Sequence, residues 1–185
     1  MNRNGVGIVL DRQLVDEVVD IRRKGVLILL IKLILGDEVL NVIGAYASQI
    51  DLNDANKRQF WKDLDEVVQR ISIKEKICIW DDFNGHVRTS RSGFENVNEG
   101  CGFGDRNETK NTILDFIVSY DIILVNTWFR KRDIHLITYK SGGNANQIDF
   151  FLIRKVGRTG QTINNGLPKI FENLKYTFKF FKIRI

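Results

Sequence analysis

The sequence predicts an α/β protein built around a mixed β-sheet. Short apolar runs with strand-like alternation are frequent, several of them are arranged as hairpins, and single helices interrupt them. This order differs from a regular strand–helix repeat, which would predict an all-parallel sheet. The chain has 185 residues, of which 43% are hydrophobic and 28% are charged. That length and composition are typical of one globular domain with a buried core.

The first part of the chain is predicted to form strands, and these cover residues 5–10, 15–21, 26–35 and 39–46. The last two flank Gly36, Asp37 and Glu38, residues that suit the tight turn of a β-hairpin. We therefore expect the third and fourth strands to pair directly.

Residues 54–71 are predicted to form a helix. Their apolar residues recur at helical spacing on one face, at Phe60, Leu64, Val67, Val68 and Ile71. A short strand at 76–80 follows, and we expect it to run directly into an acidic turn at 81–84.

The rest of the predicted domain contains a second helix and three more strands. Residues 85–107 are rich in Gly, Ser, Asn and charge, which predicts an irregular loop. A helix is expected at 108–120, and strands at 122–126, 136–139 and 147–153, the last two joined by a glycine-rich turn at 141–146.

The positive net charge of the chain is concentrated near its C-terminus. Residues 155–185 carry seven basic residues and one acidic residue, a charge of +6, which leaves −1 of the total of +5 for residues 1–154. The basic balance therefore gives no support for a nucleic-acid groove in the body of the chain. Tyr176, Phe178 and Phe180 alternate with polar residues in this segment, as in a strand that could cover an open sheet edge.

Cysteine content and hydropathy indicate the compartment. Cys78 and Cys101 do not make a disulfide framework, and no Cys/His cluster has the spacing of zinc ligands. We expect an intracellular protein, nuclear or cytoplasmic. The polar start and the ten-residue apolar run at 26–35 predict neither a signal peptide nor a membrane span, hence no membrane partner.

The first candidate site follows the strand at 76–80. Asp82 and Asn84 are two residues apart at the carboxyl end of that strand, where sites form in open α/β sheets. The carboxylate can accept a proton from water, and the amide can hold that water or a phosphate oxygen. The alternative is a turn, because Asp and Asn also cap turns.

Two further residues are candidates on predicted strands. Asp149 is a carboxylate within an apolar strand, where it either serves a partner such as a histidine or lies on a polar face. Tyr46 ends its strand and either presents its hydroxyl to a cleft or packs as a core aromatic. The two histidines, His86 and His135, form no metal or triad pattern by spacing, and we expect His135 to be structural.

Together these segments resemble the endonuclease/exonuclease/phosphatase superfamily. The signature segments occur in the family's order, around Tyr46, at Asp82-Phe83-Asn84 and around Asp149, with the helix at 54–71 between the first two. Segments 84–87, 102–108, 126–129 and 147–151 narrow the match to sequences like craniofacial development protein 2 and the endonuclease domains of LINE-type retrotransposons. The resemblance covers about residues 4–156, which we expect to be a partial domain (1–156) followed by a basic aromatic tail (157–185).

The resemblance implies a DNase I-like four-layer sandwich of two mixed sheets flanked by helices. It also implies Mg²⁺-dependent hydrolysis of DNA or another phosphodiester. By position, Asp82 would hold the attacking water, Asn84 the water or a phosphate oxygen, and Tyr46 the phosphate. Asp149 would orient a histidine, while Thr138 and His86 would lie near the substrate. The metal-binding residues are not assigned.

The family's pattern also includes segments that the chain does not show. Its first strands carry an asparagine and a metal-binding glutamate, and its last strand carries an aspartate and a histidine that transfer protons. We therefore expect a fold truncated at both ends and an inactive or impaired nuclease. The alternative is a catalytically dead retroelement remnant that acts at most as a nucleic-acid-binding or interaction module.

Overall fold

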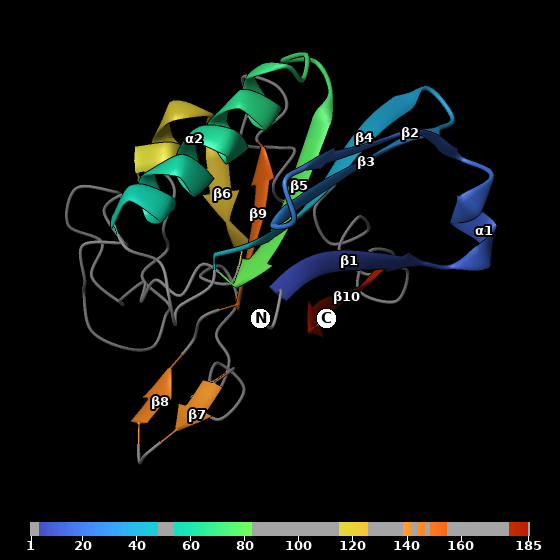
Figure 1. The fold of residues 1–185 in the computed structure, drawn as a ribbon. Coiled ribbons are helices and arrows are strands. Elements are labelled where there is room, and N and C mark those ends of the chain that lie inside the picture. Colours follow the sequence, from blue (N-terminus) through green and yellow to red (C-terminus); the bar gives the residue numbers. More distant parts are fainter. Residues whose placement is uncertain are drawn as a thin grey trace.

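The computed structural model describes residues 4–47, 54–82, 115–125, 139–141, 144–146, 149–154 and 178–184 (Figure 1). Its helices are α1 (Arg12–Val15) and α2 (Asp54–Gln69), and residues 115–119 are also helical. Its strands are β1 (Asn4–Leu10), β2 (Val18–Lys24), β3 (Ile28–Leu35), β4 (Glu38–Tyr46), β5 (Lys76–Asp82), β6 (Ile122–Leu124), β7 (Tyr139–Ser141), β8 (Asn144–Asn146), β9 (Asp149–Arg154) and β10 (Phe178–Arg184).

A six-stranded sheet forms the centre of the molecule, in the order β2-β3-β4-β5-β9-β6. The β4–β5 pair is parallel, and the other neighbouring pairs are antiparallel. The mixed sheet predicted from the hairpin-rich sequence is therefore confirmed. The parallel pair arises because α2 lies between β4 and β5 in the sequence and returns the chain to the same end of the sheet.

Turn residues fix the register of the first three strands of this sheet. Gly36 has a φ of +61° in the turn between β3 and β4, a left-handed conformation that favours glycine. The pairing then runs from Leu35 opposite Glu38 to Ile28 opposite Ala45, which confirms the predicted hairpin. Gly25, also at φ +61°, turns β2 into β3 in the same way.

One predicted strand was placed too early in the chain. The strand was expected at 15–21, but β2 starts only at Val18. Val15 instead ends the short helix α1. The Asp11 side chain caps α1 by accepting a hydrogen bond from the Gln13 backbone N–H at 3.0 Å. This cap satisfies a free N–H group at the helix start. It therefore favours a helical turn over the strand that the β-branched Val15 would favour.

Helices cover one face of the sheet (Figure 1). The predicted apolar face of α2 is confirmed, because Phe60, Leu64 and Val68 are buried with residues of β3, β4, β5 and β9. Trp61 of α2 contacts Phe116 of the helical segment 115–119, with ring centroids 5.6 Å apart. The two helices therefore share one apolar core against the sheet.

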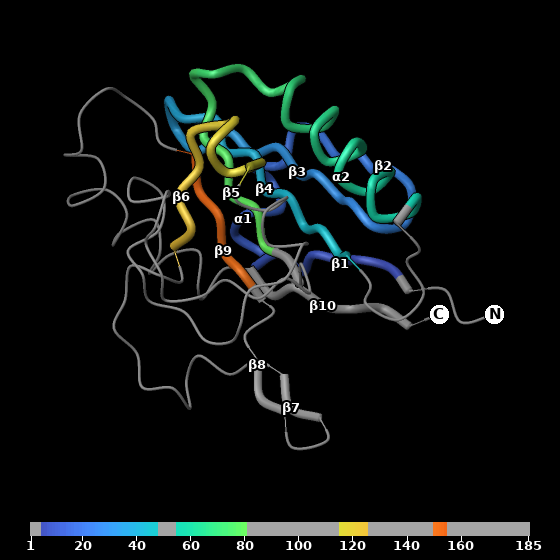
Figure 2. Tube along the Cα trace, turned by 90° about the vertical axis from the view of Figure 1, so that its left-hand side faces the viewer, coloured from blue at the N-terminus to red at the C-terminus, as the bar shows by residue number. Residues whose placement is uncertain are grey.

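The opposite face of the sheet is crossed by β1 (Figure 2), which pairs with β10 in a two-stranded ribbon. The strands pair antiparallel from Asn4 opposite Arg184 to Leu10 opposite Phe178, so the strand expected in the C-terminal segment is confirmed. The described residues thus account for a helix layer, a central sheet and a ribbon in the place of the second sheet. The full four-layer sandwich and the domain boundary at 156/157 stay predictions.

Gly44 lets the ribbon approach the sheet closely. A Cβ atom at this position would lie 3.0 Å from Val6 Cγ2 and 3.2 Å from Ile8 Cγ1. These distances are tighter than ordinary van der Waals contact, so any side chain at residue 44 would push β1 away from β4.

Some of the elements that follow β5 are confirmed in type but cover different residues from those predicted. Residues 144–146, expected to belong to a turn, form β8, which pairs with β7 as a short hairpin. Residues 115–119 confirm the second half of the helix predicted at 108–120, whose first half lies outside the described residues. The predicted loop at 85–107 also lies outside them.

Candidate functional site

Three of the candidate residues meet at one end of the central sheet. Tyr46 is the last residue of β4 and pairs in register with Asp82, the last residue of β5. Asp82 also pairs in register with Asp149, the first residue of β9. The site row, as we call Tyr46, Asp82 and Asp149, therefore crosses three neighbouring strands at a single level, although its members are up to 103 positions apart in the sequence.

Strand geometry brings these residues together. Because β4 and β5 are parallel, their carboxyl ends lie at the same edge, and the antiparallel β9 begins where they end. Neighbouring strands lie about 4.8 Å apart, so the row spans about 10 Å of backbone. That is a suitable distance for several residues to contact one small group such as a phosphate.

The acidic turn was expected at 81–84, but its first two residues belong to β5, and residues 83–84 lie outside the described residues. Asp81 and Asp82 continue β5 as paired strand residues, opposite Phe150 and Asp149. Pairing on both sides, with β4 and with β9, holds this part of the chain extended. The position of Asp82 is therefore set by the sheet and not by the geometry of a turn.

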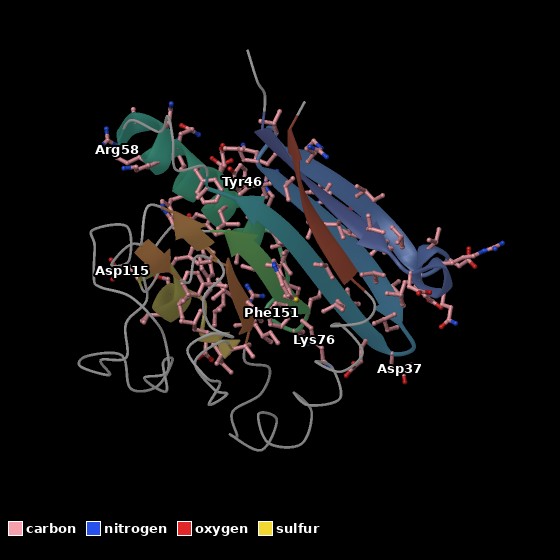
Figure 3. All side chains as sticks on the ribbon, turned by 90° about the horizontal axis from the view of Figure 1, so that it is seen from below. Asp37, Tyr46, Arg58, Lys76, Asp115 and Phe151 are labelled. Carbon is pink, nitrogen blue, oxygen red and sulfur yellow. The ribbon has the colours of Figure 1, made fainter. Side chains whose placement is uncertain are left out.

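Tyr46 belongs to the sheet face that carries the ribbon. Residues alternate between the two faces of a strand, and Val42, four positions before Tyr46 on β4, is buried in the core on the ribbon side. Tyr46 is half-buried at the end of β4 (Figure 3), and its backbone N–H donates to the Leu27 carbonyl at 2.9 Å.

An aromatic pair lies one level below the row on the same face. Trp80 and Phe151 are register partners two positions before Asp82 and two after Asp149. Their rings meet edge to face at a centroid distance of 5.2 Å. Gly44 occupies the same level on β4, directly under β1. The level below the row is thus apolar and closely packed.

The other candidate residues lie outside the described residues. These are Asn84, His86 and Thr138, together with His135. Thr138 immediately precedes β7, and Asn84 follows the end of β5 by two residues. Their contribution to the site stays a prediction.

A second polar cluster, at the opposite end of the sheet, was not identified from the sequence. Glu75 precedes β5 and accepts hydrogen bonds from Lys32 Nζ and Asn41 Nδ2, both at 2.8 Å. Arg154, at the end of β9, donates from Nη1 to the Ser72 carbonyl at 3.1 Å. We call Lys32, Asn41, Glu75 and Arg154 the Glu75 cluster. Lys32 and Asn41 are polar residues within apolar strands, and this pattern in the sequence could have indicated the cluster.

Burial and charge determine the electrostatics of the Glu75 cluster. Burial by itself favours the neutral acid, but the hydrogen bonds from Lys32 and Asn41 outweigh it and lower the pKa of Glu75. Burial lowers the pKa of the Arg154 guanidinium. Because each described charge in the cluster has a partner, the cluster is structural: it fastens the turn after α2 to three strands.

The described residues also bear on membrane and metal sites. Within the described ranges, no helix is long and apolar enough to span a bilayer. The same residues include no group of three or more His, Cys, Asp or Glu side chains placed to hold a metal ion. The buried Cys78 is not a reactive candidate, because burial raises the pKa of its thiol well above the usual value.

Comparison with solved structures identifies the fold. The chain resembles the endonuclease domain of TRAS1, a telomere-specific non-LTR retrotransposon, with a TM-score of 0.52 at 10% identity over 81% of this chain and 56% of that one. The central mixed sheet with its helices is thus an α/β fold of the DNase I-like type. The chain spans little more than half the length of that domain.

Two bacterial proteins of the same type also match, more weakly. An endonuclease/exonuclease/phosphatase family protein from Leptotrichia buccalis gives a TM-score of 0.43 at 14% identity, over 70% of this chain and 41% of that one. One from Beutenbergia cavernae gives 0.39 at 12% identity, over 83% and 38%. The sequence matches no protein-family model and no curated protein sequence.

Proposed function

We propose that the site row is the centre of a phosphodiester-binding site whose ancestral activity is metal-dependent hydrolysis of DNA, and that this activity is impaired in this chain. One observation carries the proposal: Tyr46, Asp82 and Asp149 share a register level across β4, β5 and β9. The three residues belong to sequence segments that are far apart, and strand pairing aligns them. Their common level is what a single site requires.

The residues of the row suit the recognition and hydrolysis of a phosphodiester. We assign to Asp82 the attacking water, whose proton a carboxylate can accept. We assign to Tyr46 a hydrogen bond from its hydroxyl to a phosphate oxygen, and to Asp149 the orientation of a histidine. Asn84, Thr138 and His86 would add contacts to the substrate.

The carboxylates of the row also suit a magnesium ion. Mg²⁺ takes oxygen ligands and is usually held by one or two carboxylates together with waters and substrate phosphates. Asp82 and Asp149 supply carboxylates at adjacent positions of the row, so the donor chemistry fits. When bound there, the ion would neutralise charge on the phosphate.

The histidine content of the chain limits proton transfer. The sequence contains only His86 and His135, so a histidine that serves as base, or that Asp149 orients, must be one of these two. Neither belongs to the segment in which the family's proton-transferring histidine is expected. This is the basis for proposing impaired activity, with retained binding to nucleic acid as the second candidate function.

Plasmid nicking by the purified full chain in the presence of Mg²⁺ tests the proposal. We expect slow nicking that is lost in Asp82→Asn and retained in Asp81→Asn, a matched control with the same chemical change one position away. If nicking is absent at every magnesium concentration, hydrolysis is excluded for this chain. Salt-dependent DNA binding that is weakened by Asp82→Asn would then favour the binding module.

A further inference from the structure

The edge strand β2 has features of a self-pairing surface. Among the described residues, β2 has a hydrogen-bonded neighbour on one side only, β3. Its other edge therefore presents backbone N–H and C=O groups to which another strand can pair. In the strand order β2 is a terminal strand, and β3 and β4 separate it from β5 and β9, two of the three strands that carry the site row.

The centre of this strand is apolar and exposed. Ile21, the middle residue of β2, is 62% exposed, and Val19 is also exposed. Exposed β-branched residues on an open edge favour strand addition, whereas charged residues on an edge oppose it. The deciding question is therefore whether the charges of β2 repel or attract a second β2.

Two of the four charges of β2, Asp20 and Arg22, are self-complementary in one register. They lie in the part of β2 beyond a register shift, since Val18 pairs with Leu33 and Asp20 with Lys32. If this part pairs antiparallel with its own copy about the middle of the strand, Ile21 lies opposite Ile21 of the second copy. Asp20 then lies opposite Arg22 of the second copy, and Arg22 opposite Asp20, so that two acid–base pairs flank the apolar centre. Within one chain these side chains already approach each other, with Arg22 Nε 2.6 Å from Asp20 Oδ2.

We propose that β2 is a homodimerisation edge, and that two copies of this chain join through an antiparallel β2–β2 pair centred on Ile21. The two central sheets then form one continuous sheet. The cross-strand Asp20–Arg22 pairs select this register over one shifted by one residue. In the shifted register Asp20 would face Arg23, whose guanidinium already donates to the Val6 carbonyl at 3.3 Å.

Charge reversal separates this dimer from other modes of association. Arg22→Asp places two acidic residues opposite each other, and Asp20→Arg places two basic residues opposite each other. Each single variant should therefore weaken the dimer about tenfold or more. An equimolar mixture of the two variants should restore it, because one copy then carries only Arg and the other only Asp at these positions.

The mixture is informative because it does not restore the Asp20–Arg22 contact within either chain. Recovery therefore reports an intermolecular pair and not a repaired fold. Arg58→Asp is the matched control for Arg22→Asp. Arg58 is exposed on α2 (Figure 3), and its reversal changes the net charge by the same amount as Arg22→Asp. Far-ultraviolet circular dichroism of each variant verifies the fold.

Sedimentation equilibrium of the full chain and its variants is the measurement. The proposal requires a wild-type dimer, an Arg58→Asp variant that dimerises equally well, weakened single variants and a restored mixture. It is overturned if the wild type is monomeric up to about 100 μM, a concentration at which even weak specific association is detectable. It is also overturned if the single variants dimerise like the wild type, or if mixing them restores nothing.

Discussion

The two ends of the central sheet both carry polar residues, but they differ in what those residues do. At one end, the Glu75 cluster consists of charges that contact one another and the backbone. At the other end, the site row aligns Tyr46, Asp82 and Asp149 at one register level. The first end receives the chain from α2, and the second lies where the parallel strands finish.

This difference shows how one sheet separates stability from chemistry. The amino ends of β4 and β5 must accommodate the turn that follows α2, so polar residues there are engaged in fastening it. Their carboxyl ends lie at the edge where sites in α/β sheets typically form. Substitutions at the first end should therefore change stability, and substitutions in the row should change ligand binding.

The largest expected effect is the loss of stability when the Glu75 cluster is disrupted. Glu75→Ala removes the carboxylate that accepts from Lys32 and leaves the buried Asn41 with its longer bond to the Lys76 carbonyl, at 3.3 Å. We expect the free energy of unfolding to fall by about 3 kcal/mol. Urea denaturation measures this change. Glu38→Ala is the control, because Glu38 pairs with Lys76 with a side chain that is 58% exposed, and its loss should cost less than about 1 kcal/mol. Equal losses in the two variants would contradict the structural role of the cluster.

A smaller effect is expected where the ribbon crosses the sheet. In Gly44→Ala the new methyl group meets Val6 and Ile8, so the free energy of unfolding should fall by about 1–3 kcal/mol. Gly5→Ala is the matched control, because its Cβ would meet only the Val26 carbonyl oxygen at an ordinary 3.5 Å. If both variants unfold at the same denaturant concentration, β1 does not pack on β4 as described.

The smallest expected effect on stability is its dependence on pH. The pKa of folded Glu75 is lowered from its usual 4.5, so its charge stabilises the fold above that pH. The contribution is lost as the pH falls through the folded value. The difference in unfolding free energy between the wild type and Glu75→Gln should therefore shrink as the pH falls below 4.5 and through the folded pKa. A difference that grows on acidification would contradict a lowered pKa of Glu75 in the folded state.

Periodicity in the sequence predicted most of the fold but only part of the site. The spacing of Phe60, Leu64 and Val68 was sufficient to identify α2, and Gly36 identified the hairpin, because both signals are local. The extension of β5 through Asp82 was missed, since it depends on pairing with β4 and β9. The Glu75 cluster was missed for the same reason: Asn41 and Glu75 are 34 residues apart and meet only in the folded sheet.

The site row was predicted residue by residue, but its geometry was not. Nothing in the sequence states that Tyr46, Asp82 and Asp149 occupy one level, because register is a property of paired strands. Asn84, His86 and Thr138 follow or precede described strands, and their roles stay predictions.

Calorimetric titration of Mg²⁺ into the full chain most directly tests whether the row is one site. We expect Mg²⁺ binding to be weakened in Asp82→Asn and in Asp149→Asn and to be unaffected in Asp81→Asn. The Asp82→Asn/Asp149→Asn double variant should bind Mg²⁺ no more weakly than whichever single variant binds it less tightly. Such non-additivity is the signature of two residues that act on one ligand. Two independent losses that add fully, or magnesium binding that is indifferent to both substitutions, would contradict a single site at this end of the sheet.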